Sequence, residues 1–196
     1  MFTGIIEAIG TVVTAASGGL TIEAAGIMSG LVLGESVAVD GVDLTVSTVV
    51  ADSFSANVMP ETYRRSTLAN LPPGRRVNLE RSVLATTRLS GHIVRGVVEG
   101  TARVEHVAAE DDALVYRFSA GHDLVDHMVL KGPVAVDGAS FTIVDLTRNS
   151  FSVSVVSYSQ THTTITDRTV GDLVNVETDI LGRYVEAAVK RHFSPG

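Results

Sequence analysis

An internal repeat constrains the fold of this chain more than any other feature. Residues 37–80 align with residues 134–177 at a constant offset of 97 without a gap, and 15 of the 44 aligned pairs are identical. Chance alone would give about one identity in fifteen at ordinary residue frequencies. The segment Val37–Gly41, for example, returns unchanged as Val134–Gly138. The repeat predicts two copies of one fold, of which one can keep chemistry while the other keeps only binding.

Composition narrows the class of partner. The net charge is −7 over 196 residues and no basic run occurs, so neither nucleic acid nor an anionic membrane surface is expected as a partner. Cysteine is absent, which excludes disulfides, thiolate metal sites and thiol nucleophiles. No apolar run reaches the roughly 18 residues of a membrane span, and no secretion signal is recognisable at the start. We therefore expect a soluble cytoplasmic protein with no membrane partner.

Apolar and polar residues mostly alternate along both copies. Ser36–Gly41 and Phe151–Val155 have the period of two that is typical of strands. Glycine and Asp-Gly pairs interrupt these runs at short intervals, as in small all-β barrels. Short helices are expected at Asp123–Leu130 and in the matching region around Ala25–Leu33.

The clearest helix signal lies after the repeat, from Gly182 to about Phe193. Val185 and Val189 stand four residues apart on its apolar stripe, together with Ala188 and His192. An appended helix of this kind either covers a core or joins subunits.

Three segments together resemble the riboflavin synthase family: Met1–Glu7, Val58–Arg65 and Val77–Arg81. The resemblance covers nearly the whole chain, including the duplication. It implies an all-β fold, a tandem pair of six-stranded Greek-key β-barrels with a C-terminal α-helix, assembled as a homotrimer. The corresponding units are residues 1–90, 91–181 and 182–196.

The resemblance also implies a ligand and a reaction. Family enzymes bind two molecules of 6,7-dimethyl-8-ribityllumazine, and one passes a four-carbon unit to the other, which yields riboflavin and a ribitylamino-pyrimidinedione. No metal or organic cofactor is required. The positions of this chain that match family binding positions are Ser36, Thr45, Lys131, Ser140, Thr142 and Asp179. Small hydroxyls in an apolar pocket suit the polar edge of a flat heterocycle.

Two positions depart from the family pattern. The family's catalytic cysteine is Asp43 here, and the second histidine of its Gly-Gly-His motif is Val97. The family reaction passes through a lumazine anion formed by loss of a proton from the C7 methyl group. Valine neither accepts that proton nor donates a hydrogen bond, and an ionised Asp43 repels the anion. Asp43 and Ser36 are the candidate catalytic residues, and Val97 is expected against the substrate.

A further difference lies in the second copy, where Ser157–Thr161 replaces the family's Pro-x-Thr-Leu-Glu segment. Three functions remain open. The chain is a working riboflavin synthase, a transferase, with rerouted proton transfers; a lumazine- or flavin-binding protein without turnover; or a paralogue recruited to another cyclisation or condensation, with Asp43 as acid or base.

Other signals carry less weight. His122 and His127 are five residues apart and do not share a helical face, and no set of residues has metal-ligand spacing. His92 is expected to have a structural role where the two copies meet, and Glu110–Asp112 to form a solvated hairpin tip.

Overall fold

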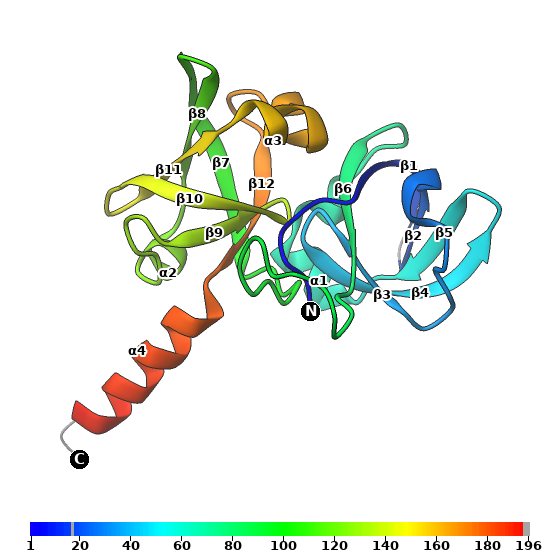
Figure 1. Cartoon of the computed structure of the whole chain (residues 1–196), viewed down its shortest axis with the longest axis horizontal. Helices are drawn as coiled ribbons and strands as arrows, with labels where there is room; N and C mark the ends of the chain where they lie inside the picture. Colours follow the sequence, from blue (N-terminus) through cyan, green and yellow to red (C-terminus); the bar gives the residue numbers. More distant parts are fainter. Residues whose placement is uncertain (17, 194–196) are drawn as a thin grey trace.

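The computed structural model describes residues 1–16 and 18–193, which form two closed six-stranded antiparallel barrels and a projecting C-terminal helix (Figure 1). The first barrel consists of β1 (Ala8–Ala16), β2 (Gly19–Glu23), β3 (Ser36–Val39), β4 (Val42–Val50), β5 (Ser53–Asn57) and β6 (Arg76–Arg81). The second consists of β7 (Gly100–Glu110), β8 (Ala113–Ser119), β9 (Pro133–Val136), β10 (Ala139–Leu146), β11 (Ser150–Val155) and β12 (Leu173–Thr178).

Both barrels have the same topology. The first runs β1-β2-β5-β4-β3-β6 around its circumference, and the equivalent strands of the second follow the same order. Strand β2 pairs with β5 rather than with β3, which is the crossover of a Greek key. The predicted pair of six-stranded barrels is therefore confirmed. We propose residues 1–90, 91–181 and 182–196 as the units, of which 194–196 lie outside the described residues.

The alternation seen in the sequence separates the interior of each barrel from its outer face. Val42, Leu44 and Val46 of β4 are buried in the first core, so the residues between them, among them Asp43 and Thr45, point outward. On β10, Ala139, Phe141 and Ile143 fill the second core in the same way, and Ser140 and Thr142 lie on the outer face. All the candidate strand residues thus stand on outer faces.

The helices agree with the sequence only in part. The C-terminal helix α4 spans Ile180–Phe193, two residues longer at its start than predicted. The helix predicted at Asp123–Leu130 is limited to α2, His122–Val125, and Ala25–Leu33 yields only a 3-10 turn, Ala25–Ile27. Two helices were not predicted, α1 (Pro60–Arg65) and α3 (Ser157–His162). Two further 3-10 turns, Thr67–Asn70 and Thr164–Asp167, follow them.

A small apolar cluster lies between the barrels. Phe2 and Val94 exchange backbone hydrogen bonds of 2.7 and 3.1 Å and pack with Ala38 and Ala135. Nearby, the two Asp-Gly turns meet, and a Cβ built on Gly41 would lie 2.7 Å from the Gly138 nitrogen. Glycine is required there because the two backbones approach too closely for any side chain.

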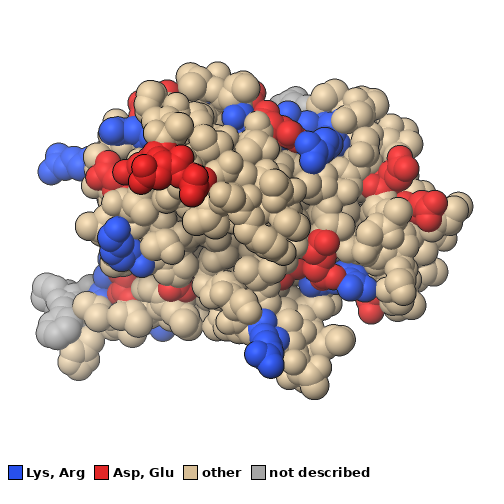
Figure 2. Space-filling view, turned by 45° about the horizontal axis from the view of Figure 1, so that its top comes forward, with Lys and Arg blue, Asp and Glu red and all other residues tan. Residues whose placement is uncertain are grey.

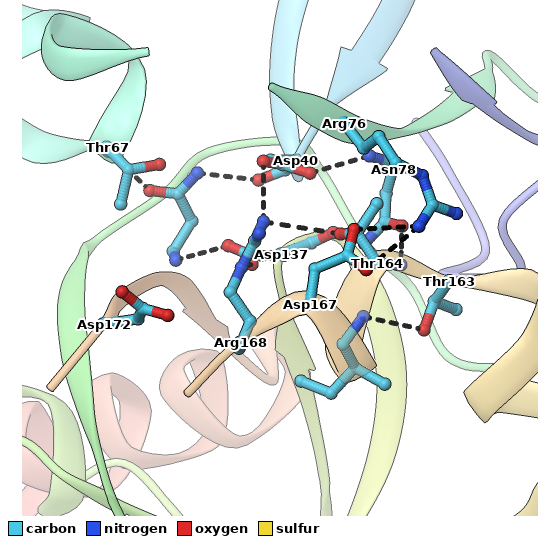
Figure 3. Close-up of polar contacts among 12 residues, drawn as sticks. Asp40, Thr67, Arg76, Asn78, Asp137, Thr163, Thr164, Asp167, Arg168 and Asp172 are labelled. Carbon is cyan, nitrogen blue, oxygen red and sulfur yellow. Dashed lines mark hydrogen bonds and ion pairs between the residues drawn. The ribbon is translucent and has the colours of Figure 1, made fainter. Parts of the chain in front are cut away.

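The polar side chains beside this contact are nearly symmetric (Figure 3). The Asn78 side chain donates to the Asp137 carbonyl at 2.8 Å, and the Asn175 side chain donates to the Asp40 carbonyl at 2.9 Å. Each aspartate in turn accepts from the asparagine backbone of its own barrel, at 2.7 and 2.8 Å. All four side chains are buried. The repeat has thus kept the residues by which the two copies dock.

Arg168 breaks the symmetry of this contact. Its guanidinium donates to Asp137 at 2.7 Å and to Asp40 at 3.2 Å, and it is 3% exposed. The repeat places Leu71 at the matching position of the first copy. One arginine therefore balances two buried carboxylates, which fixes the relative position of the barrels.

Charge is dispersed over the surface. On the face that Figure 2 displays, Lys and Arg side chains stand in small separate groups with Asp and Glu nearby. The acidic segment Glu110–Asp112 forms the tip of the β7–β8 hairpin, as predicted. Within residues 1–16 and 18–193, no helix is both long and apolar enough to cross a membrane.

Candidate functional site

A cleft of about 1070 Å3 lies between the two barrels, bordered by α1, α4 and the segment 95–99. It contains Asp43 from the outer face of β4 and Val97 from the segment that enters the second barrel. The Asp43 amide donates to the Gly96 carbonyl at 2.9 Å, which holds the two side chains on adjacent backbone. The two positions that departed from the family pattern are therefore neighbours.

Glu177 holds this segment in place. Its buried carboxylate accepts hydrogen bonds from the backbone amides of Arg95, Gly96 and Val97 at 2.8 to 2.9 Å. Burial raises the pKa of Glu177, although these hydrogen bonds oppose the shift. Glu80, its counterpart in the first copy, binds the Thr3 amide and hydroxyl and the Gly4 amide in the same way, and burial raises its pKa too.

The cations around the cleft are already paired. Arg65 pairs with Glu61 at 3.0 Å, and Arg183 pairs with Glu99 at 2.7 Å. Asp43 differs: among the described residues, its exposed carboxylate forms no ion pair and accepts no hydrogen bond. An unpaired anion in a cleft repels a second negative charge and favours a hydrogen-bond donor or a cation.

The other candidates of the first barrel lie beside Asp43. Ser36 and Thr45 are directly opposite each other on β3 and β4, and Ala38 is opposite Asp43. Their outward side chains share one face of the sheet. Neither Ser36 nor Thr45 lines the large cleft.

The candidates of the second barrel form a separate set. Ser140 is half-buried and Thr142 is exposed on the outer face of β10. Lys131 is exposed just before β9, with a φ of 66° and an amide that donates to the Ile143 carbonyl at 2.9 Å. The Asp179 carboxylate accepts from the Leu181 amide at 3.0 Å at the start of α4. The large cleft includes none of these four residues.

With this geometry known, comparison with other proteins is informative. The family model described as "Lumazine binding domain" matches residues 3–82 and 95–179. Riboflavin synthase of Bacillus subtilis (strain 168) is 38% identical over 189 residues, which cover 94% of this chain and 88% of that protein. Riboflavin synthase of Schizosaccharomyces pombe is 38% identical over 200 residues, covering 99% and 96%.

The chain belongs to the riboflavin synthase family. Among solved structures, LumP complexed with riboflavin superposes with a TM-score of 0.84 at 22% identity, over 91% of this chain and 99% of that one. LumP complexed with 6,7-dimethyl-8-(1'-D-ribityl) lumazine superposes with a TM-score of 0.82. These two structures share the fold.

Within this family fold, the two barrels present different helices beside their outer faces. In α1, Glu61 binds Arg64 at 2.6 Å and Arg65 at 3.0 Å. In α3, which contains the unusual segment Ser157–Thr161, the Tyr158 and His162 rings stack with centroids 3.9 Å apart. The duplication has therefore left one charged helix and one aromatic helix.

Sequence reasoning missed one contact. His92 lies at the junction of the barrels as expected, but its Nδ1 is 2.7 Å from the Ser140 Oγ, so it contacts a candidate binding residue. Its side chain is buried, and burial lowers the pKa of its imidazole, while the charge of Asp179 opposes that shift. The position of His92 in the family motif was the available signal, but no spacing connects it to Ser140, 48 residues away.

No metal site stands out. The described residues contain no group of three His, Cys, Asp or Glu side chains placed to hold an ion. His127 instead pairs with Glu186 of α4, with Nδ1 2.6 Å from the carboxylate.

Proposed function

We propose that this protein binds 6,7-dimethyl-8-ribityllumazine or riboflavin, and that its dismutation of the lumazine to riboflavin is weakened or altered. The observation that carries the proposal is the presence of Asp43 and Val97 side by side in one cleft of a riboflavin synthase fold. These are the positions of the family's cysteine and histidine. Its class, on this proposal, is a transferase with reduced turnover, acting in the cytoplasm.

The physical argument for reduced turnover is one of charge and proton transfer. Two like charges about 4 Å apart cost on the order of 4 kcal/mol at an effective dielectric near 20. A barrier higher by that amount slows a reaction by roughly several hundred-fold or more. Asp43 is exposed and unpaired among the described residues, so no neighbouring cation offsets its repulsion of a lumazine anion.

The argument for retained binding rests on the outer faces of the strands. Hydroxyls stand in the family's binding positions on both barrels, at Ser36 and Thr45 in the first and at Ser140 and Thr142 in the second. Hydrogen bonds from such groups orient a heterocycle while apolar surface supplies most of its affinity.

A recruited function is the second candidate, and one observation favours it. The Asp43 carboxylate is available to a ligand, because no described residue bonds to it. A carboxylate in this position can take a proton from an N–H or C–H acid other than the lumazine, in a different cyclisation or condensation. Binding without any turnover is the third candidate.

We also propose a homotrimer formed through α4. Val185 is 64% exposed and Val189 is 50% exposed, and Leu181 and Tyr184 are exposed beside them. An apolar helix face of this size in a single chain needs a partner to cover it. In Figure 1, α4 projects away from both barrels, which leaves this face accessible to another subunit.

Two measurements on the purified protein test the proposal. The first is a fluorescence titration with the lumazine and with riboflavin, for which we expect saturable binding and quenched or shifted emission. The second is the rate of riboflavin formation from the pure lumazine, for which we expect a rate far below the 0.1–10 per second that is roughly ordinary for enzymes. Failure to bind either compound contradicts the binding proposal and favours the recruited function.

A further inference from the structure

The His92 imidazole and the Ser140 hydroxyl form an isolated polar pair at the seam of the two barrels. The Nδ1–Oγ distance is 2.7 Å, short enough for a well-formed hydrogen bond. His92 is 8% exposed, whereas Ser140 is half-buried on the outer face of β10, next to Thr142. The pair therefore connects a buried base to a surface on which a ligand is proposed to bind.

The backbone on both sides fixes this pair. The Ser140 amide donates to the Gly4 carbonyl at 2.8 Å, and the His92 amide donates to the Thr3 carbonyl at 3.1 Å. A Cβ built on Gly91 would lie 3.2 Å from the Ser140 Oγ and would meet the Thr3 carbonyl. Only glycine leaves room for the imidazole and the hydroxyl to meet, so the two groups are held together before any ligand arrives.

The second ring nitrogen is the unusual feature. The His92 Nε2 is buried and has no hydrogen-bond partner among the described residues. Buried polar atoms normally have partners, so an unsatisfied one calls for a functional explanation. Burial lowers the pKa of His92, which keeps the ring neutral at neutral pH, and Asp179 is the charged group that acts on it in the opposite sense.

We propose that His92, acting through Ser140, is the proton acceptor of the second barrel. The inference rests on the proposed function, since the proton comes from a bound ribityllumazine. Its C7 methyl C–H bond breaks, the proton passes to the Ser140 Oγ, and the hydroxyl proton passes to the His92 Nδ1. The products are the lumazine anion and an imidazolium ion near the Asp179 carboxylate. Ser140 is the catalytic residue and His92 is its positioning base.

This arrangement accounts for a proton acceptor in a chain that has Val97 in place of the family's second histidine. Asp43 and Val97 lie in the cleft beside the first barrel, and Ser140 does not line that cleft. Deprotonation at the second barrel is therefore separate from the repulsion that Asp43 exerts at the first. The chain is expected to form the anion yet to complete dismutation poorly.

The test measures anion formation alone. The full-length protein is mixed with the lumazine in D2O, and proton NMR follows the loss of the C7 methyl signal as deuterium replaces hydrogen. We expect wild type to accelerate this exchange over buffer, and His92→Asn to lower the exchange by about 100-fold, the lower end of general acid–base contributions. The Asn Oδ1 still accepts from Ser140, so lumazine affinity should change less than about threefold. Ser140→Ala should lower the exchange to a similar extent, and the double variant no further.

The control is His106→Asn, which removes an exposed histidine of β7 and should leave the exchange unchanged. A His92→Asn protein that binds the lumazine and exchanges at the wild-type rate overturns the inference. So does a wild type that binds the lumazine but exchanges it no faster than buffer. Absence of lumazine binding to wild type would instead show that the proposed function itself is wrong.

The pH profile provides a readout if His92→Asn fails to fold. Because the neutral ring accepts the proton, the wild-type exchange rate should rise with pH through the pKa of His92, below the usual value near 6.5. NMR titration of the His92 ring gives that pKa independently. A rate midpoint that differs from it by more than about one unit contradicts the relay.

Discussion

Single residues distinguish the two barrels at the candidate site. The repeat aligns Asp43 with Ser140 and Thr45 with Thr142, so the outer faces match except for one carboxylate in place of one hydroxyl. A carboxylate accepts hydrogen bonds but donates none, whereas a hydroxyl does both. The second barrel is therefore the better site for a ligand with carbonyl oxygens at its edge.

This difference predicts the outcome of paired substitutions. Ser140→Ala with Thr142→Ala should weaken lumazine or riboflavin binding, because each lost hydrogen bond contributes about 0.5–1.5 kcal/mol. Ser36→Ala with Thr45→Ala, the matched pair on the first barrel, should have the smaller effect. Fluorescence titration of the two double variants measures both. If only the first-barrel pair weakens binding, the ligand occupies the other barrel.

Among the elements, α4 carries the clearest prediction. Changing Val185 and Val189 to Asp places two charges on the exposed apolar face and should dissociate the proposed trimer, since an unpaired charge buried in an interface is strongly unfavourable. Arg191→Gln on the last turn of the same helix is the control and should leave the assembly intact. Light scattering reports the mass. A wild-type monomer, or a trimer that survives both Asp substitutions, contradicts this role of α4.

The elements also mark how far sequence reasoning reached. Period-two alternation and the repeat predicted both barrels, because every strand buries one face. Helices α1 and α3 were missed because neither has a buried residue, so no apolar stripe announces them. The helix predicted at Asp123–Leu130 stops early, since Lys131 adopts a left-handed conformation and Val129 and Leu130 are exposed.

Candidate residues were predictable only where a motif or the repeat pointed to them. Asp43 and Val97 were recognised by departure from a pattern, and their proximity follows from one backbone hydrogen bond. The pairing of His92 with Ser140 was not predictable, because it depends on how the start of the chain crosses between the barrels. Contacts between copies leave no periodic signal.

At the scale of the whole molecule, buried charge joins the barrels. Burial and the nearby Asp137 raise the pKa of Asp40 to about 8, from 3.8, although Arg168 opposes the shift. The folded state thus holds this proton more tightly than the unfolded chain does. The stability that the protonated group contributes is present at pH values below about 4 and is lost as the pH rises through about 8.

Removing the arginine should expose this dependence. Arg168→Leu, which copies the residue at the matching position of the first barrel, leaves two buried carboxylates without a cation, and should cost about 3–5 kcal/mol at pH 8. The cost should shrink at pH 5, where a carboxylate takes up a proton more readily. Urea unfolding at both pH values provides the measurement.

The matched control for this charge is Arg76→Leu. Arg76 pairs with Asp167 at 2.9 Å at the surface (Figure 3), and such pairs contribute about 0–1 kcal/mol. Equal losses from Arg168→Leu and Arg76→Leu, with no dependence on pH, would show that the buried cluster does not hold the barrels together.

The central claim is that Asp43 and Val97 limit dismutation in a protein that still binds the lumazine. The most direct test is the rate of riboflavin formation per subunit from pure lumazine, for wild type and for Asp43→Cys, Val97→His and the double variant. We expect a very slow wild type and a double variant that gains more than the two single gains combined, since both groups act on one step. A wild-type rate of about 0.1–10 per second would contradict the claim, and so would a double variant that binds the lumazine yet gains no turnover.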